Sequence, residues 1–305
     1  MIDLSLPHGR RLRSRSTVVM GIVNATPDSF YTGSRTPSVA GAVHAALGMV
    51  ASGAAVIDVG GESTRPGSDY ISVEEELSRV VPVVEAIRRE SDVAISVDTR
   101  HLATVRAAFD AGADIVNDVT ALRDEPGIAG FAAANGMPVV LMHMLGTPRE
   151  MQRDPSYDDV VAEVSAFLRE RCDAAIADGV ASQAIVVDPG IGFGKRLRDN
   201  IDLIARLNEL CSLGYPVLVG LSRKSFLGRI SSDGEAPPPE ERLAATIAAH
   251  VIAIQKGADI IRVHDVAEAV ATVRVVDAIW GRQRETRADG PAPRAGDQGE
   301  TGSQT

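Results

Sequence analysis

Short apolar runs alternate with longer alanine-rich segments along most of the chain. The runs are rich in valine and isoleucine, and they are nearly continuous instead of alternating apolar with polar residues. This pattern predicts strands that are buried on both faces, as in a parallel sheet. We therefore expect eight strands, at Val18–Val23, Val56–Val59, Ala94–Val97, Ile115–Asn117, Pro138–Met142, Ile185–Val187, Pro216–Val219 and Ile260–Val263.

The segments between these runs carry helix signals. Ser72 followed by Glu75 forms a capping box, and Ser38 and Ser156 stand at expected N-cap positions. Six of the seven junctions that lead from a helix back to a strand have a glycine near the helix end, where it supplies a left-handed cap. These glycines are Gly53, Gly112, Gly136, Gly179, Gly214 and Gly257.

Eight strand–helix units predict an α/β fold, a single (β/α)8 TIM barrel. A doubly wound open sheet is the alternative, but the chain has no strong Gly-x-Gly-x-x-Gly opening for it. A weak internal repeat supports one repeated unit, because residues 53–58, 112–117 and 257–262 share a glycine cap, a buried strand and a polar residue. The repeat gives equivalent positions to Asp58, Asn117 and Arg262.

The two ends of the chain differ from the rest. Residues 283–305 have no aliphatic side chain larger than that of alanine, so burial cannot offset their ordering entropy and we expect a disordered tail. Residues 1–16 contain four arginines without helical periodicity, which predicts a short solvated arm or a small hairpin. The expected organisation is an N-terminal arm at 1–16, the barrel at 17–282 and the tail at 283–305.

The composition of the chain argues against several classes of protein and of binding partner. The 305 residues include 31 Lys and Arg against 41 Asp and Glu, a net charge of −10, which disfavours binding to nucleic acid or an anionic membrane. No apolar run approaches the roughly 18 residues that a membrane-spanning helix needs. The two cysteines, Cys172 and Cys211, exclude a disulfide framework and a zinc-finger cluster. We expect a cytoplasmic protein with small-molecule substrates.

Polar residues follow every predicted strand. In a (β/α)8 barrel the loops after the strands meet at one end, which holds the active site. Helix capping could explain single cases such as Asp58, but a polar group after all eight strands favours a functional site. The set comprises Asn24, Asp58, Glu62, Asp98, Asn117, His143, Asp188, Ser222, Arg223, Lys224, Arg262 and His264.

The chemistry of this set indicates an anionic ligand with a flat ring. Cations after the seventh and eighth strands stand where such barrels often bind phosphate. The acids Asp98 and Asp188 and the amide Asn117 suit a heterocycle with adjacent N–H donors and a carbonyl acceptor. No histidine spacing for zinc is present. Mg²⁺ needs only one or two protein oxygens beside substrate phosphates, and Asn24 is a candidate ligand.

In order along the chain, these residues resemble the motifs of dihydropteroate synthases, from about Val18 to Trp280. Residues 20–30 (MGIVNATPDSF) look like the first signature of that family, and residues 55–67 (AVIDVGGESTRPG) look like the second. The remaining matches follow in the expected order at 96–99 (SVDT), 116–119 (VNDV), 188–195 (DPGIGFGK), 222–224 (SRK) and 262–265 (RVHD). Each piece is short, but the ordered set is specific.

The resemblance implies a transferase of folate biosynthesis. In this reaction 6-hydroxymethyl-7,8-dihydropterin diphosphate condenses with p-aminobenzoate to give 7,8-dihydropteroate and pyrophosphate. It also implies Mg²⁺ as the cofactor, a homodimer packed through late helices, and a sulfonamide target.

The resemblance also assigns roles to residues of this chain. The implied pterin pocket is formed by Asp98, Asn117, Asp188 and Lys224 and lined by Met142 and Gly220. The implied diphosphate site consists of Asn24, which also touches Mg²⁺, with Arg65, Arg262 and His264. The implied p-aminobenzoate site consists of Thr64, Pro66, Phe193 and Ser222. The implied catalytic residues are Asp98, Lys224 and Arg65.

Two other functions fit the same barrel. A pterin methyltransferase that serves a corrinoid protein binds no diphosphate, so the cations Arg65, Lys224, Arg262 and His264 argue against it. A non-catalytic pterin-binding relative would be expected to lose parts of the loops at 64–66 and 222–224, which this chain keeps. Only Tyr31 and Thr32 favour it, because the family usually has a small hydroxyl residue and an aspartate there.

Overall fold

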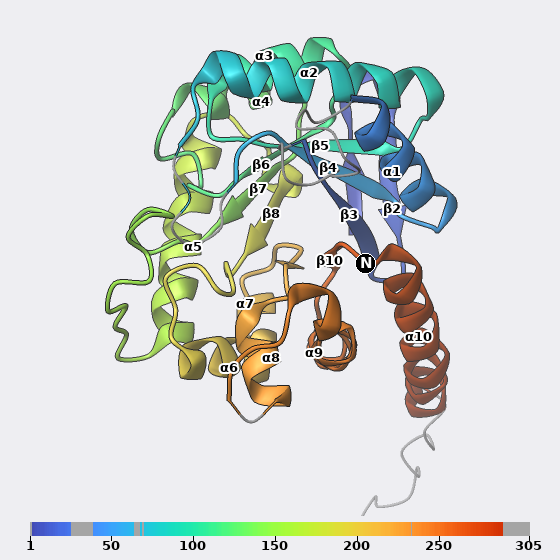
Figure 1. The fold of residues 1–305 in the computed structure, drawn as a ribbon, viewed down its shortest axis with the longest axis vertical. Helices are drawn as coiled ribbons and strands as arrows, with labels where there is room; N and C mark the ends of the chain where they lie inside the picture. The colour runs from blue at the N-terminus through green and yellow to red at the C-terminus, as the bar shows by residue number, and fades with distance from the viewer. Residues whose placement is uncertain (1, 26–38, 64–67, 69, 233, 289–305) are drawn as a thin grey trace, which may run out of the picture.

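Eight parallel strands form a barrel in a computed structural model that describes residues 2–25, 39–63, 68, 70–232 and 234–288. Their order is β8-β7-β6-β5-β4-β3-β10-β9, and a bridge between Val187 and Val217 joins β8 to the chain entering β9 (Figure 1). The strands are β3 Val18–Asn24, β4 Val56–Gly60, β5 Ala94–Asp98, β6 Ile115–Asp118, β7 Val139–Met142, β8 Ile185–Asp188, β9 Leu218–Val219 and β10 Ile260–Val263. The predicted (β/α)8 barrel is confirmed.

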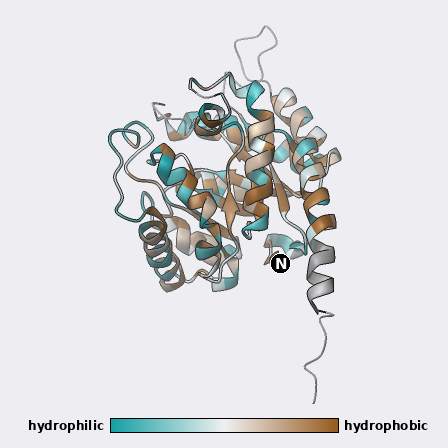
Figure 2. Cartoon of the chain, turned by 90° about the horizontal axis from the view of Figure 1, so that it is seen from below, coloured by the Kyte–Doolittle hydropathy of each residue, from teal (hydrophilic) through white to brown (hydrophobic). Residues whose placement is uncertain are grey.

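Helices surround the strands. They are α1 Val39–Ala51, α2 Val73–Glu90, α3 Leu102–Asp110, α4 Gly127–Asn135, α5 Val160–Ala177, α6 Leu197–Ala205, α7 Leu207–Cys211, α8 Ser225–Ser231, α9 Leu243–Gln255 and α10 Val266–Ala288. Short 3-10 helices stand at Pro7–Gly9, Ser182–Ala184 and Pro239–Arg242. Figure 2 shows hydrophobic strands at the centre and hydrophilic residues on outward parts of the helices. The apolar runs are therefore buried on both faces, as their pattern predicts.

All eight predicted strands occur, and β9 differs most from its prediction. It comprises Leu218 and Val219, although the apolar run begins at Pro216. Pro216 has no N–H to donate. The Val217 N–H donates to the Asp259 carboxylate at 3.0 Å instead of to a strand carbonyl. The strand therefore begins only at Leu218, because the N–H of Val217 is bonded to a side chain.

The glycine caps are confirmed, and the N-caps only in part. All six predicted glycines have positive φ, between 64° and 107°. Ser72 accepts the Glu75 N–H at 3.2 Å, as expected. The prediction for Ser156 is wrong, because α5 begins at Val160 and Asp159 caps it by accepting the N–H groups of the next turn. Ser38 lies outside the described residues.

The N-terminal residues form the small hairpin that was one of the two expectations. Strands β1 (Ile2–Ser5) and β2 (Arg11–Ser14) pair antiparallel, and their apolar side chains pack against the amino ends of the barrel strands. Arg10 and Arg88 both bind the fully buried carboxylate of Asp114, at 2.5 and 2.6 Å. The hairpin therefore closes the base of the barrel. At the other end of the chain, α10 runs to Ala288, past the expected start of the tail, and residues 289–305 lie outside the described residues.

Candidate functional site

Arg262 joins three strands at the carboxyl end of the barrel. From β10, its Nε donates to Asp58 Oδ2 on β4 at 2.6 Å, and its Nη2 donates to Asp98 Oδ2 on β5 at 2.7 Å. Asn117 on β6 donates its amide N–H to the same Asp58 oxygen at 3.2 Å. The three positions related by the internal repeat therefore meet in one network. Asp58 lies within β4 and is completely buried, so the helix-cap interpretation of this residue is wrong.

The charges in this network do not balance. Burial, together with the nearby charge of Asp58, raises the pKa of Asp98 to about 7, although Arg262 opposes the shift. Burial would lower the pKa of Arg262, but Asp58 and Asp98 raise it, so Arg262 remains a cation. One guanidinium thus faces two carboxylates. A ligand that carries N–H donors, or that develops positive charge, complements this excess of acceptors.

A second cluster comes from the loops after β8 and β9. Asp188 Oδ1 accepts the Gly190 N–H at 2.7 Å, and the Lys224 ammonium lies 4.4 Å from the centre of the Phe193 ring. Burial raises the pKa of Asp188 to about 6 against the effects of Gly190 and Lys224. Burial lowers the pKa of Lys224 to about 8, although Asp188 raises it. Asp188 and Lys224 are therefore mainly charged at pH 7.

Apolar and hydroxyl groups form the walls around these charges. Met142 is buried in a cluster with Val119, Met144 and Met151, and Phe193 packs against this cluster. At Gly220, a Cβ atom would meet nothing within 4 Å, so the backbone borders open space. Ser222 is buried, and its Oγ lies 3.0 Å from His264 Nδ1. These residues come from β7 and from the loops after β8, β9 and β10.

The described structure brings most of the predicted site residues to one end of the barrel. Asn24 ends β3 and is half-buried. Arg262 lowers the pKa of Asp188, so the two clusters are within electrostatic reach of each other. The predicted residues Thr64, Arg65 and Pro66, and the departure at Tyr31 and Thr32, lie outside the described residues.

Sequence reasoning missed Lys195. This lysine is 3% exposed, and its ammonium lies 2.9 Å from His143 Nδ1, beside the second cluster. Its position at the end of a glycine-rich loop was the only signal, and lysine in such a loop is usually exposed. Glu76 was also missed, because its place in a helix with acidic neighbours indicates a solvated residue. It is instead completely buried and raises the pKa of Asp98.

Among the described residues, no group of three or more His, Cys, Asp and Glu side chains is placed to hold a metal ion. Within the same residues, no helix has the length and hydropathy to cross a membrane.

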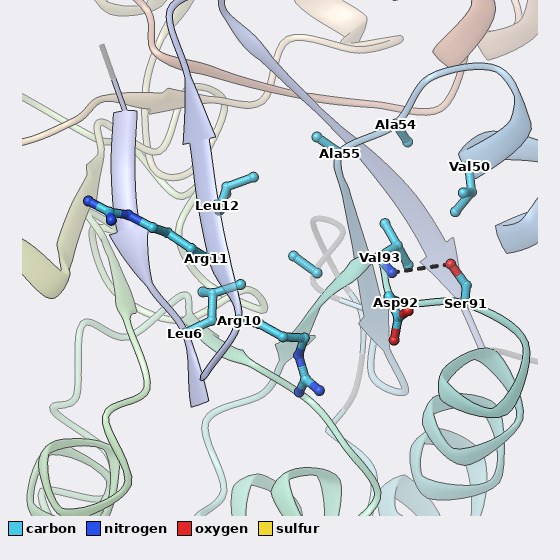
Figure 3. A pocket seen from close by; sticks show the side chains of 11 residues that line it. Leu6, Arg10, Arg11, Leu12, Val50, Ala54, Ala55, Ser91, Asp92 and Val93 are labelled. Atoms are coloured by element: carbon cyan, nitrogen blue, oxygen red, sulfur yellow. Dashed lines mark hydrogen bonds between the residues drawn. The ribbon is translucent and has the colours of Figure 1, made fainter. Parts of the chain in front are cut away.

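A cavity of about 790 Å³ lies at the base of the barrel, at the end opposite to Asp58 and Asp98. Figure 3 shows Leu6, Arg10 and Leu12 of the hairpin on one side of it and Ala55 and Val93 on the other. These barrel residues precede β4 and β5, whereas Asp58 and Asp98 stand at or near the opposite ends of the same strands. No predicted site residue lines the cavity. In this fold the base contributes stability, and chemistry takes place at the carboxyl end.

Comparison with known proteins identifies close relatives. A profile of pterin-binding enzymes matches residues 20–264. The dihydropteroate synthase of Escherichia coli strain K12 is 48% identical over 289 residues, which cover 94% of this chain and 96% of that protein. The dihydropteroate synthase of Yersinia pestis, solved with a sulfonamide drug complex, is 43% identical with a TM-score of 0.85, covering 92% of this chain and 100% of that one. The Xanthomonas albilineans dihydropteroate synthase, solved with 7,8-dihydropteroate, is 44% identical with a TM-score of 0.82, covering 91% and 98%.

Proposed function

The chain belongs to the pterin-binding enzyme family as a dihydropteroate synthase, and we propose that the two clusters together bind the pterin, with the p-aminobenzoate site beside the second cluster. The enzyme condenses 6-hydroxymethyl-7,8-dihydropterin diphosphate with p-aminobenzoate, giving 7,8-dihydropteroate and pyrophosphate. The observation that carries the proposal is the Arg262 network, which combines a cation with an excess of buried acceptors at the carboxyl end of the barrel.

The pterin ring binds in the deep part of the site. Asp98, Asn117 and Asp188 pair with the ring, and Lys224 borders it. This assignment is supported by their burial, because an unpaired donor on a bound ring would cost about 1–3 kcal/mol there. Met142 and Gly220 line the ring, one with an apolar surface and the other with open space.

The diphosphate lies nearer the mouth, against Arg262 and His264, with Arg65 as a third cation. The family uses a divalent metal, and we assign Mg²⁺ to it. Asn24 fits this ion, because Mg²⁺ takes oxygen ligands and draws most of them from water and substrate phosphates. When bound, the ion would neutralise charge on the leaving pyrophosphate.

The second substrate binds over the loop after β8. Phe193 and Ser222 contact p-aminobenzoate, together with Thr64 and Pro66. Phe193 supplies an aromatic face for the ring of p-aminobenzoate, and the Lys224 ammonium lies 4.4 Å from the centre of the Phe193 ring. The half-buried position of Phe193 supports this assignment, because part of the ring packs against the methionine cluster and part of the side chain remains exposed.

Catalysis depends on charged side chains that lie beside the atoms on which opposite charge develops in the transition state. The pterin methylene carbon loses pyrophosphate, and the positive charge on that carbon spreads into the ring. An ionised Asp98 stabilises this charge more in the transition state than in the ground state. Lys224 and Arg65 stabilise the developing negative charge. The p-aminobenzoate nitrogen is already a competent nucleophile, so the reaction needs no dedicated base.

Product analysis separates this function from its alternatives. Purified protein with both substrates and Mg²⁺ should release pyrophosphate and form 7,8-dihydropteroate in equal amounts. A pterin methyltransferase would release no pyrophosphate, and a non-catalytic pterin-binding protein would bind the pterin without turnover. Pyrophosphate release that does not depend on p-aminobenzoate would contradict the proposal.

We further propose a cytoplasmic homodimer packed through α9 and α10. Three large apolar side chains on these helices, Ile252, Val275 and Ile279, are 44%, 58% and 50% exposed. Exposed apolar side chains of this size on adjacent helices are typical of an interface between subunits. Sedimentation at micromolar concentration should give a dimer, and Val275→Glu should shift it toward monomer. A wild-type protein that sediments only as a monomer would contradict this.

A further inference from the structure

Lys195 is a buried lysine to which the chemistry above assigns no role, and burial lowers its pKa to about 7, although Asp188 raises it. It ends the loop after β8, and its ammonium has three acceptors in reach. These are His143 Nδ1 at 2.9 Å, the Phe193 carbonyl at 3.0 Å and the His143 carbonyl at 3.4 Å. In its protonated form the side chain has three N–H donors, so each donor can be matched within the protein. Lys195 is therefore placed to hold the protein and not a substrate.

His143 is suited to accept from Lys195. Burial and the charge of Lys195 together lower the pKa of His143 to about 2, so the ring is neutral. The edge of the ring packs on Phe167, with their centres 4.8 Å apart. Because His143 directly follows β7 and Lys195 ends the loop after β8, their contact ties two neighbouring loops together.

The loop between Asp188 and Lys195 needs such ties. Gly190, Gly192 and Gly194 have no side chains that could pack and restrain the loop, and all three adopt positive φ, a conformation that glycine allows. Hydrogen bonds hold it instead. Gln152 donates to the Gly192 carbonyl and Tyr157 donates to the Gly194 carbonyl, each at 2.7 Å. Lys195 holds the carbonyl of Phe193, the residue between them.

We propose that Lys195 is a positioning residue for p-aminobenzoate, acting with His143 to fix the Phe193 ring against Lys224. The inference rests on the proposed assignment of Phe193 to this substrate. Without the ammonium, the Phe193 carbonyl is released and the ring no longer has one position relative to Lys224. Asp98 and Asn117 of the pterin pocket keep their positions, because they are held by Arg262 and Asp58 on other strands. Asp188 keeps the Gly190 N–H, although loss of the Lys195 charge raises its pKa.

Steady-state kinetics of three full-length variants tests this role. Lys195→Met keeps the length of the side chain but removes its donors, and Phe193→Leu removes the ring. Tyr157→Phe is the matched control, because it removes a bond to the neighbouring Gly194 carbonyl. We expect Lys195→Met to raise KM for p-aminobenzoate on the order of tenfold, as loss of a buried hydrogen bond does. Its affinity for a pterin without diphosphate should change by less than about twofold, and the KM of the control by less than about threefold.

The outcomes separate this role from the assignment on which it rests. An unchanged KM in Lys195→Met, with a raised KM in Phe193→Leu, overturns the role of Lys195 alone. An unchanged KM in Phe193→Leu overturns the assignment and the role together. Equal increases in Lys195→Met and Tyr157→Phe overturn the role, because any anchor of the loop would then serve. If Lys195→Met does not fold, His143→Leu removes the Nδ1 acceptor and carries the same expectation.

Discussion

At the scale of single residues, the site depends on one guanidinium shared by two carboxylates. Asp58 and Asp98 reach Arg262 from neighbouring strands, and Asn117 donates to Asp58 from the next strand. Burial disfavours charge on Asp98, so an ionised Asp98 is stabilised most when positive charge develops beside it. This is the condition under which a carboxylate accelerates a reaction through a cationic transition state.

Replacing Asp98 should remove a pH-dependent part of the stability. The pKa of Asp98 in the folded protein is about 7, above its value in an unfolded chain, so Asp98 stays protonated to a higher pH in the folded state than in the unfolded state. The contribution of Asp98 to the free energy of unfolding is therefore largest in acid and is lost as the pH rises toward 7. Relative to wild type, the free energy of unfolding of Asp98→Asn should rise by about 2–3 kcal/mol between pH 5 and pH 8. Urea denaturation measures it, and an equal difference at both pH values would contradict the assignment.

Arg262→Lys should weaken binding of the pterin diphosphate more than binding of the pterin alone. A guanidinium pairs with phosphate oxygens in a fork, and Asp58 and Asp98 fix its orientation. A lysine ammonium cannot reproduce this geometry. Calorimetry with both ligands measures the two losses. Arg206→Lys is the matched control, because Arg206 also bridges two carboxylates but contacts no site residue. Equal losses for the two ligands in Arg262→Lys would exclude a specific diphosphate contact.

At the scale of elements, the strands and the turns that end the helices could be predicted from the sequence. The apolar runs indicated all eight strands, because strands buried on both faces need continuous apolar residues. The internal repeat indicated that Asp58, Asn117 and Arg262 are equivalent, and these side chains meet. The pattern did not reveal contacts that depend on the path of a loop. The pair Lys195–His143 joins loops 52 residues apart, and nothing local marks either residue as buried.

Two glycines with nearly the same φ should respond differently to alanine. Gly136 has φ 64° and a Cβ there would meet nothing within 4 Å, so Gly136→Ala should cost about 1–2 kcal/mol of backbone strain. Gly190 has φ 62°, but a Cβ there would lie 1.9 Å from the His143 carbonyl oxygen. We expect Gly190→Ala to lower the melting temperature more and to reduce pterin affinity, because the clash displaces the loop and with it the N–H that residue 190 donates to Asp188. Thermal unfolding and calorimetry test both, and equal effects would contradict the close packing of this loop.

At the scale of the whole molecule, one end of the barrel contributes to stability and the other carries the proposed substrate site. The hairpin of β1 and β2 closes the base, where its apolar side chains bury against the first residues of the strands. The charged residues proposed to bind the substrates lie at the opposite end. Stability and chemistry should therefore be separable by mutation, as expected for this fold.

Leu4→Ala tests that separation. Leu4 is buried in the base cluster, so its truncation should lower the free energy of unfolding by about 2–4 kcal/mol. The KM values for both substrates should not change below the melting temperature of the variant, because Leu4 packs at the end of the barrel opposite to the site. Urea denaturation and steady-state kinetics give the two quantities. A raised KM in a fully folded variant would show that the base and the site are coupled.

The central claim is that buried acceptors at the carboxyl end of the barrel hold the pterin ring, and calorimetric titration of a pterin tests it most directly. Asp188→Ala should lose about 1–3 kcal/mol of binding free energy, because ring donors are left unpaired in a buried site. Asp202→Ala, on the exposed face of α6, is the control and should bind as the wild type does. Unchanged pterin affinity in Asp188→Ala would contradict the account.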